Sequence, residues 1–181
     1  MKKEECILFS GGAQGAEAEF GAAAERSGIE EVNFTFEGHK MARTRGIRML
    51  NHEELKKGDV SLSYVSGLMK RQYPNAPVIR KVLQTIWYQV NSGQEVYVVG
   101  RIMDDGTVRG GTGWGAEFAK ICNKPLFVFD QEKDRWFAWE EDHWVERETP
   151  TIGHRHITGT GTRFLEENGR RAIADLFSNS F

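Results

Sequence analysis

The chain has 181 residues, of which 39% are hydrophobic and 28% charged, and its formal net charge at pH 7 is -2. This length predicts a single domain over residues 1–181, and this composition excludes a disordered or fibrous chain. The balance of charges argues against an extended nucleic-acid or anionic-membrane surface, because such surfaces need an excess of Lys and Arg. Twenty glycines against four prolines indicate close backbone approaches rather than a flexible linker.

The cysteines and the first residues of the chain bear on its compartment. Cys6 and Cys122 lie among apolar residues and are interpreted as small buried hydrophobes, with a disulfide as the alternative. Glu4 and Glu5 stand where a signal peptide would be apolar, and no segment approaches the roughly 20 apolar residues of a membrane span. We therefore expect a cytoplasmic protein with neither a membrane nor a nucleic-acid partner.

The start of the chain predicts a strand–helix–strand unit. An apolar run over 6–9 ends at a glycine turn, a helix with one apolar face follows over 13–26, and the alternating segment 31–36 predicts a second strand. This order implies a parallel sheet with right-handed crossovers. The next segment carries four cations without an acid between them, which either contact a ligand phosphate or form a solvated loop: Lys40, Arg43, Arg45 and Arg48.

The middle and end of the chain continue the alternation of helices and strands. Apolar rows at helical spacing predict a long helix over 77–91, and shorter helices are expected over 51–58 and 114–123. Buried strands are predicted over 95–100 and 126–129, and an amphipathic helix closes the chain. The expected fold is therefore α/β, a Rossmann-like open parallel sheet flanked by helices.

An aromatic segment after the last core strand predicts an antiparallel hairpin, so that about 126–149 forms an edge strand plus the hairpin. Its aromatic side chains are separated by charged turns: Trp136, Phe137, Trp139 and Trp144. We interpret them as packing over an exposed sheet face. The alternatives are stacking on a base or pterin, and a protein-interaction module in which the hairpin docks a partner.

Three glycine turns each follow a predicted strand and precede a predicted helix: Ser10-Gly11-Gly12, Gly110-Gly111-Thr112-Gly113, and 158–163. The carboxyl ends of parallel strands meet at one edge of a sheet, so these turns should be neighbours. Free backbone N–H groups at helix N-termini favour an anion, and a phosphate fits this geometry, with Arg163 as a further contact. The predicted ligand-binding residues are Ser10, Gly11, Gly12, Gln14, Gly110, Gly111, Thr112, Gly113, Trp114, Gly159, Thr160 and Arg163.

Other site chemistries are not supported by the sequence. No turn has the Gly-Lys-Ser/Thr ending of a P-loop, and none gives a full G-x-G-x-x-G with an acid about 20 residues later. ATP hydrolysis and ordinary NAD use are therefore disfavoured. His154 and His156 could bind a metal, but two histidines without a Cys or carboxylate partner fix no coordination geometry, so no metal site is predicted.

The first turn also resembles a known family. The segment Ser10-Gly11-Gly12-Ala13-Gln14-Gly15-Ala16-Glu17 is similar to the Ser-Gly-Gly-x-x-Gly-x-Asp opening of the Rossmann-like SLOG superfamily, with Glu17 in place of the usual Asp. Segments 105–108, 110–112, 116–119, 124–125 and 157–163 resemble its molybdenum-cofactor carrier family. The resemblance implies a homo-oligomer that binds a nucleotide or molybdopterin-type phosphorylated small molecule at the carboxyl edge of the sheet, as a carrier or sensor.

A second resemblance leaves an enzymatic alternative open. The segment from Gly110 to Glu117 is similar to the Gly-Gly-x-Gly-Thr-x-x-Glu stretch of the cytokinin-activating phosphoribohydrolases, although Trp114 replaces Thr. The last Glu of that family acts at the ribose during N-glycosidic cleavage of nucleoside 5'-monophosphates, so Glu117 is the candidate catalytic residue. Alternatively, Glu117 only stabilises the helix dipole, by about 0.3–1 kcal/mol. Trp114 could stack on a ligand ring.

Overall fold

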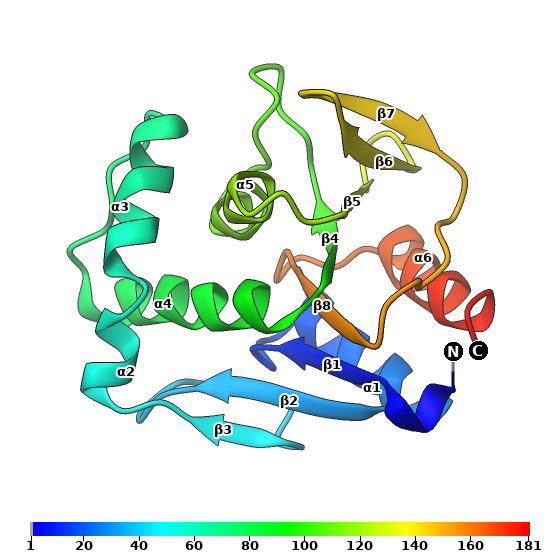
Figure 1. Cartoon of the computed structure of the whole chain (residues 1–181), viewed down its shortest axis with the longest axis horizontal. Helices are drawn as coiled ribbons and strands as arrows, with labels where there is room; N and C mark the ends of the chain where they lie inside the picture. The colour runs from blue at the N-terminus through cyan, green and yellow to red at the C-terminus, as the bar shows by residue number, and fades with distance from the viewer. Residues whose placement is uncertain (1) are drawn as a thin grey trace.

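The computed structural model describes residues 2–181, so that Met1, the first residue of the predicted domain, lies outside the described part. Eight strands form one sheet in the order β3-β2-β1-β8-β4-β5-β6-β7 (Figure 1). The first six of these pair in parallel, and β6 and β7 are antiparallel. The expected fold class is therefore confirmed: a Rossmann-like α/β sheet with an appended aromatic hairpin.

The strands are β1 (Ile7–Ser10), β2 (Glu30–Thr35), β3 (Ile47–Met49), β4 (Glu95–Gly100), β5 (Leu126–Asp130), β6 (Arg135–Glu140), β7 (His143–Arg147) and β8 (His156–Gly161). The helices are η1 (Lys3–Glu5), α1 (Ala16–Ser27), α2 (His52–Lys56), α3 (Asp59–Leu68), α4 (Pro77–Ser92), α5 (Thr112–Ile121) and α6 (Glu167–Ser178). Most of the predicted elements are present within three residues of their expected bounds. In the described residues, no helix has the length and apolar character needed to cross a bilayer.

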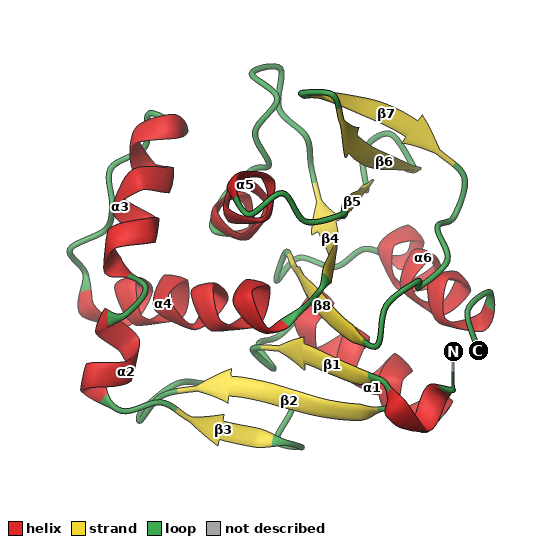
Figure 2. Cartoon of the chain, in the orientation of Figure 1, coloured by secondary structure: helices red, strands yellow, loops and turns green. Residues whose placement is uncertain are grey.

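Helices cover both faces of the sheet (Figure 2). Alternate side chains of β4 show the two layers, because Tyr97 and Val99 pack in the core with α1 and α6, whereas Val96 and Val98 pack in the core with α3, α4 and α5. All six residues of β4 are buried, as expected for a central parallel strand. A third, smaller core lies under α2 at the β2–β3 end of the sheet.

Local sequence signals explain where several helices begin and end. Asn51 caps α2 in a capping box with Glu54, and α4 begins at Pro77, whose missing N–H is not needed in a first turn. The Lys124 ammonium donates to carbonyl groups at the end of α4, among them Val90 at 2.5 Å and Asn91 at 3.1 Å. It therefore caps a helix whose last turn has no basic residue of its own.

Two segments differ from the sequence-based expectation. Residues 158–161 were expected to form a glycine turn but belong to β8, where Thr158 and Thr160 are buried between β1 and β4. The residue between them, Gly159, has to be a glycine, because a Cβ at this position would lie 2.5 Å from the Phe20 ring. Helix α3 was not predicted, because its sequence has no charged face to mark its amphipathic period.

Candidate anion-binding site at the carboxyl edge of the sheet

The three predicted site segments come together at the carboxyl ends of β1, β8 and β4, which are neighbours in the sheet. Thr160 of β8 links them. Its hydroxyl donates to the Glu17 carboxylate in α1 at 3.0 Å, and its Cγ2 lies 3.7 Å from where a Cβ on Gly115 in α5 would be. The first turns of α1 and α5, which lie on opposite faces of the sheet, therefore both approach Thr160 at the end of β8.

The turn between β1 and α1 is filled by the protein itself. Gly11 and Gly12 are both buried. A Cβ on Gly11 would lie 2.5 Å from the Gln89 amide nitrogen and 2.6 Å from the Glu17 carboxylate, and one on Gly12 would lie 2.8 Å from the Arg43 carbonyl oxygen. These glycines therefore admit neighbouring protein groups and leave little room for a ligand at this turn.

Glu17 places an internal carboxylate at the N-terminal end of α1. It is buried and accepts the Ala13 N–H at 3.0 Å as well as the Thr160 hydroxyl. With its amide oriented to satisfy both neighbours, Gln89 donates to Glu17 and accepts from the Gly11 N–H, each at 3.3 Å. Burial raises the pKa of Glu17, and the hydrogen bonds from Ala13, Thr160 and Gln89 oppose that rise.

A small cleft of about 260 Å³ opens beside the same turn. Gln14, Gly15 and Arg163 line it, and Arg163 is exposed with its guanidinium carbon 4.8 Å from the Phe164 ring centroid. Arg170 also lines the cleft but pairs with Glu19. Within residues 2–181, Arg163 has no carboxylate partner, so this predicted residue presents an uncompensated positive charge at the cleft.

The turn between β4 and α5 is open. Gly110 and Gly111 are exposed, and no atom lies within 4 Å of the position of a Cβ on either. In the described part of the chain, the N–H groups of Gly110, Gly111 and Thr112 have no acceptor. Gly113 differs, because a Cβ there would clash with the Val108 carbonyl. Three free amides at the start of a ten-residue helix are suited to an anion.

Arg71, which sequence reasoning missed, holds this open turn in place. It comes from the loop between α3 and α4, and its guanidinium donates to the carbonyls of Val108 and Gly110, both at 3.1 Å, and to the Thr107 hydroxyl at 2.8 Å. A guanidinium has five N–H donors, so two remain for a ligand. A lone Arg in a segment without pattern gives no signal in the sequence.

Several other predicted site residues are turned into the protein. Trp114 is only 4% exposed and packs against Tyr73, with ring centroids 5.5 Å apart, so its interpretation as a stacking platform is wrong. Ser10 is buried and donates to the Gly159 carbonyl at 2.7 Å. Gly159 and Thr160 lie inside β8.

Glu117 points toward the hairpin side of α5. Its carboxylate lies 3.1 Å from the Lys120 ammonium, which in turn lies 3.7 Å from the Trp139 ring centroid and 5.0 Å from that of Trp144. Trp139 and Trp144 are half-buried against the core under α5. The hairpin therefore packs on the body of the protein, as expected, and Glu117 belongs to that contact.

Three of the four cations in the basic run after β2 pair with acids of the protein. Arg43 and Arg45 both pair with Glu31 and with Glu25, and Arg48 pairs with Glu54. This favours a structural loop over a phosphate-binding one. In the described residues, no three His, Cys, Asp or Glu side chains are placed to hold a metal ion.

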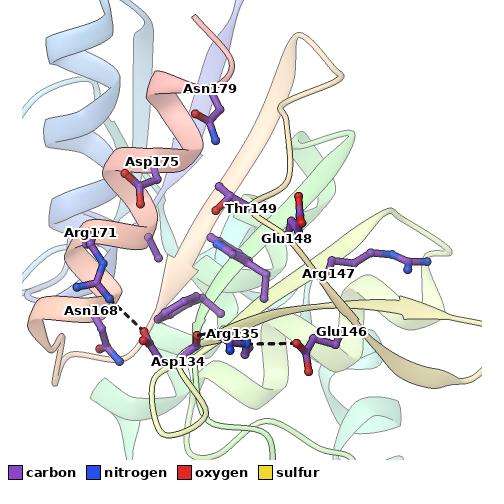
Figure 3. A pocket seen from close by; sticks show the side chains of 13 residues that line it. Asp134, Arg135, Glu146, Arg147, Glu148, Thr149, Asn168, Arg171, Asp175 and Asn179 are labelled. Atoms are coloured by element: carbon purple, nitrogen blue, oxygen red, sulfur yellow. Dashed lines mark hydrogen bonds and ion pairs between the residues drawn. The ribbon is translucent and has the colours of Figure 1, made fainter.

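A wider hollow, about 790 Å³, lies between α6 and the hairpin (Figure 3). Its lining is charged, and Figure 3 shows Arg171 paired with Asp134 and Arg135 with Glu146. The third arginine of the groove, Arg147, pairs with Glu140. All its arginines are thus compensated, so the groove lacks the free cation that a phosphate site needs.

Comparison with known proteins bears on the fold. No family model matches the sequence, and no curated protein matches it either. Among solved structures, a "Putative molybdenum carrier protein" from Syntrophus aciditrophicus SB is similar, with a TM-score of 0.54 and 14% sequence identity. The likeness covers 98% of this chain and 96% of that chain. At this identity it shows a shared fold over nearly the whole length.

Proposed function

We propose that this protein binds a small molecule through its phosphate, or a similar oxyanion, at the start of α5. The observation that carries the proposal is the open backbone at Gly110 and Gly111. Their N–H groups, and that of the buried Thr112, have no acceptor in residues 2–181. The amides and the helix dipole favour a negative charge there. Arg71 is fixed beside them by three hydrogen bonds, so its two remaining N–H groups are pre-organised for a bidentate contact.

The rest of the ligand would follow the carboxyl edge of the sheet toward Arg163. Gln14, Gly15 and Arg163 line the cleft at that side. At the turn between β1 and α1, the buried Glu17 carboxylate already occupies the helix N-terminus, so a second phosphate is disfavoured there. We therefore infer a ligand with its main anionic group at α5 and a second contact at Arg163.

A nucleotide or a molybdopterin-type compound fits this description. The resemblance of the three Gly-rich segments to the SLOG superfamily favours this class, and so does the name of the structural neighbour, a "Putative molybdenum carrier protein". We propose a carrier or sensor role, in a homo-oligomer. The pairing of Glu117 with Lys120 favours a structural role for that carboxylate and gives no support to nucleotide hydrolysis.

The proposal is tested by titration calorimetry with AMP, inorganic phosphate and molybdate. Replacing Arg71 by Met removes the guanidinium, and Gly111→Leu places a side chain over the free amides. Gly111 has φ -61°, so this side chain fits without backbone strain. We expect each variant to weaken binding about 10–100-fold, the usual cost of losing a hydrogen bond to a charged group, and Arg163→Ala to weaken AMP more than phosphate.

Arg155→Ala is the matched control, because Arg155 is an exposed arginine near the opposite edge of the sheet that pairs with Glu5. Melting curves of each variant separate loss of binding from loss of fold. If none of the three compounds binds the wild type, or if Arg71→Met and Gly111→Leu bind as well as Arg155→Ala, the anion site is not at α5.

A further inference from the structure

Helix α3 exposes an apolar stripe that no other part of the described chain covers. No charged residue occurs from Val60 to Met69. Leu62, Val65 and Met69 are buried in the core, whereas Val60, Tyr64 and Leu68 are 83%, 62% and 45% exposed. Residues four apart lie on one side of a helix, so these three side chains form a single row.

Such a face is unusual on a surface helix. The solvent side of an amphipathic helix normally carries charged and polar residues, and large exposed apolar patches on soluble proteins mark interaction sites. Figure 1 shows α3 at one end of the molecule, where only the loop that leads to α4 runs outside it. This face takes no part in the proposed ligand site, so the inference below rests only on the homo-oligomer named with that function and not on ligand binding.

The first turn of α4 enlarges the apolar surface. It lies beside the first turn of α3, since Arg80 pairs with Asp59 at 3.4 Å. Val78 and Ile79 are 61% and 55% exposed there. A standard interface takes about 800 Å² from each partner, which is more than five partly exposed side chains offer. Neighbouring residues would supply the rest, so the area suits a reversible association.

We propose that the α3 face docks against the same face of a second copy of this chain. A two-fold interface requires a self-complementary patch. The row is symmetric about Tyr64, since an antiparallel copy centred there sets Val60 against Leu68 of the partner subunit. Ser63 and Gly67 beside Tyr64 are small, and no atom lies within 4 Å of a Cβ on Gly67, so a notch is open for the ring of the opposing Tyr64.

The absence of charge also favours a second copy over an unrelated partner. A heterologous partner is commonly selected by complementary charges, and this face offers none between Asp59 and Lys70. Burial of two identical apolar rows needs only shape and symmetry. The expected species is therefore a concentration-dependent dimer with antiparallel α3 helices.

Sedimentation velocity over a hundredfold concentration range tests the association. We expect the wild type to shift from monomer to dimer, and Tyr64→Arg and Val60→Arg to remain monomers because each buries a charge at the centre or end of the row. Ile121→Arg is the control, since Ile121 is a 40% exposed apolar residue on α5, and it should dimerise like the wild type. Arg71→Met should also dimerise, whatever its effect on ligand binding.

Cross-linking tests the antiparallel geometry in a Cys122→Ser background, where the remaining Cys6 is 1% exposed. With a short bismaleimide, Tyr64→Cys should cross-link to itself. Val60→Cys should cross-link efficiently only when mixed with Leu68→Cys. A wild type that stays monomeric at every concentration, or a dimer that survives Tyr64→Arg and gives no Tyr64→Cys cross-link, overturns the proposal.

Discussion

Gly159 lies under the ring of Phe20, whereas Gly111 faces open space. Both occur in Gly/Thr-rich segments that look alike in sequence, and both were assigned to the ligand site. In the structure, one lets a buried aromatic ring approach a central strand, and the other leaves helix N–H groups accessible. The same residue type therefore serves packing at one position and exposure at the other.

A pair of alanine substitutions separates these two roles. Gly159→Ala should destabilise the protein by about 1–3 kcal/mol, the usual cost of overpacking a core, because the new Cβ would lie 2.5 Å from Phe20. Gly111→Ala should change stability by less than about 0.5 kcal/mol, as surface substitutions usually do. Urea unfolding measures both. Equal effects would show that the contact with Phe20 relaxes freely.

Glu17 makes the stability of the protein depend on pH. Burial raises its pKa above the ordinary value of 4.5, so the folded state holds the proton more tightly than the unfolded state. The resulting stabilisation is complete below the unfolded pKa and is lost as pH rises through the folded pKa. The Glu17 carboxylate therefore costs more stability at neutral pH than at pH 4.

Glu17→Gln should remove this dependence. Urea unfolding at pH 4 to 8 gives the free energy of unfolding of both proteins. We expect the difference, wild type minus variant, to fall as pH rises and then to level off. Glu25→Gln is a control of opposite sign, because hydrogen bonding to Arg43 lowers the pKa of Glu25. The wild type should therefore become more stable than Glu25→Gln as pH rises. A flat difference curve for Glu17→Gln would contradict the buried charge.

One lysine adds polar contacts between the hairpin β6–β7 and the body of the protein. The Lys120 ammonium lies over the rings of Trp139 and Trp144, pairs with Glu117, and donates to the Gly106 carbonyl at 3.2 Å. The Trp144 indole donates to the same carbonyl at 2.8 Å. This contact joins the hairpin, α5 and the loop that leads to the candidate anion site.

Lys120→Met should loosen the hairpin while keeping the apolar stem. We expect a loss of about 1–2 kcal/mol, on the scale of a desolvated cation–π contact, with faster amide exchange in β6 and β7. Lys133→Met is the matched control. Lys133 is half exposed, and its ammonium lies 5.2 Å from the centroid of the Phe137 ring, farther than Lys120 lies from Trp139. Unchanged exchange in both variants would mean that apolar packing alone holds the hairpin.

The elements that the sequence predicts well are those with a clear apolar period. Helix α4 and strand β4 have the expected positions because their rows of Val and Ile are unambiguous. Helix α3 escapes prediction because its outer face is as apolar as its inner one. Arg71 escapes because its partners are backbone carbonyls and a hydroxyl almost 40 residues away in sequence. Contacts of this kind leave no local pattern.

At the scale of the whole molecule, the central strands tie the two helical layers together. β1, β8 and β4 are adjacent, and their side chains enter the cores on both faces. The hairpin joins both cores too, since Trp136 packs with α6 and Trp139 with α5. No boundary divides the sheet, so we propose that residues 1–181 unfold as one domain.

Calorimetry of dilute protein tests this cooperativity. At about 0.7 kcal/mol per residue near 60 °C, a chain of this length should unfold with an enthalpy of roughly 130 kcal/mol, equal to the van't Hoff value. Three of the five tryptophans belong to the hairpin, so fluorescence follows mainly that region, whereas far-ultraviolet circular dichroism follows the helices. Coincident midpoints are expected, because exposing Trp136 opens the core under α6. An earlier fluorescence transition would show that the hairpin is a separate unit appended to a smaller domain.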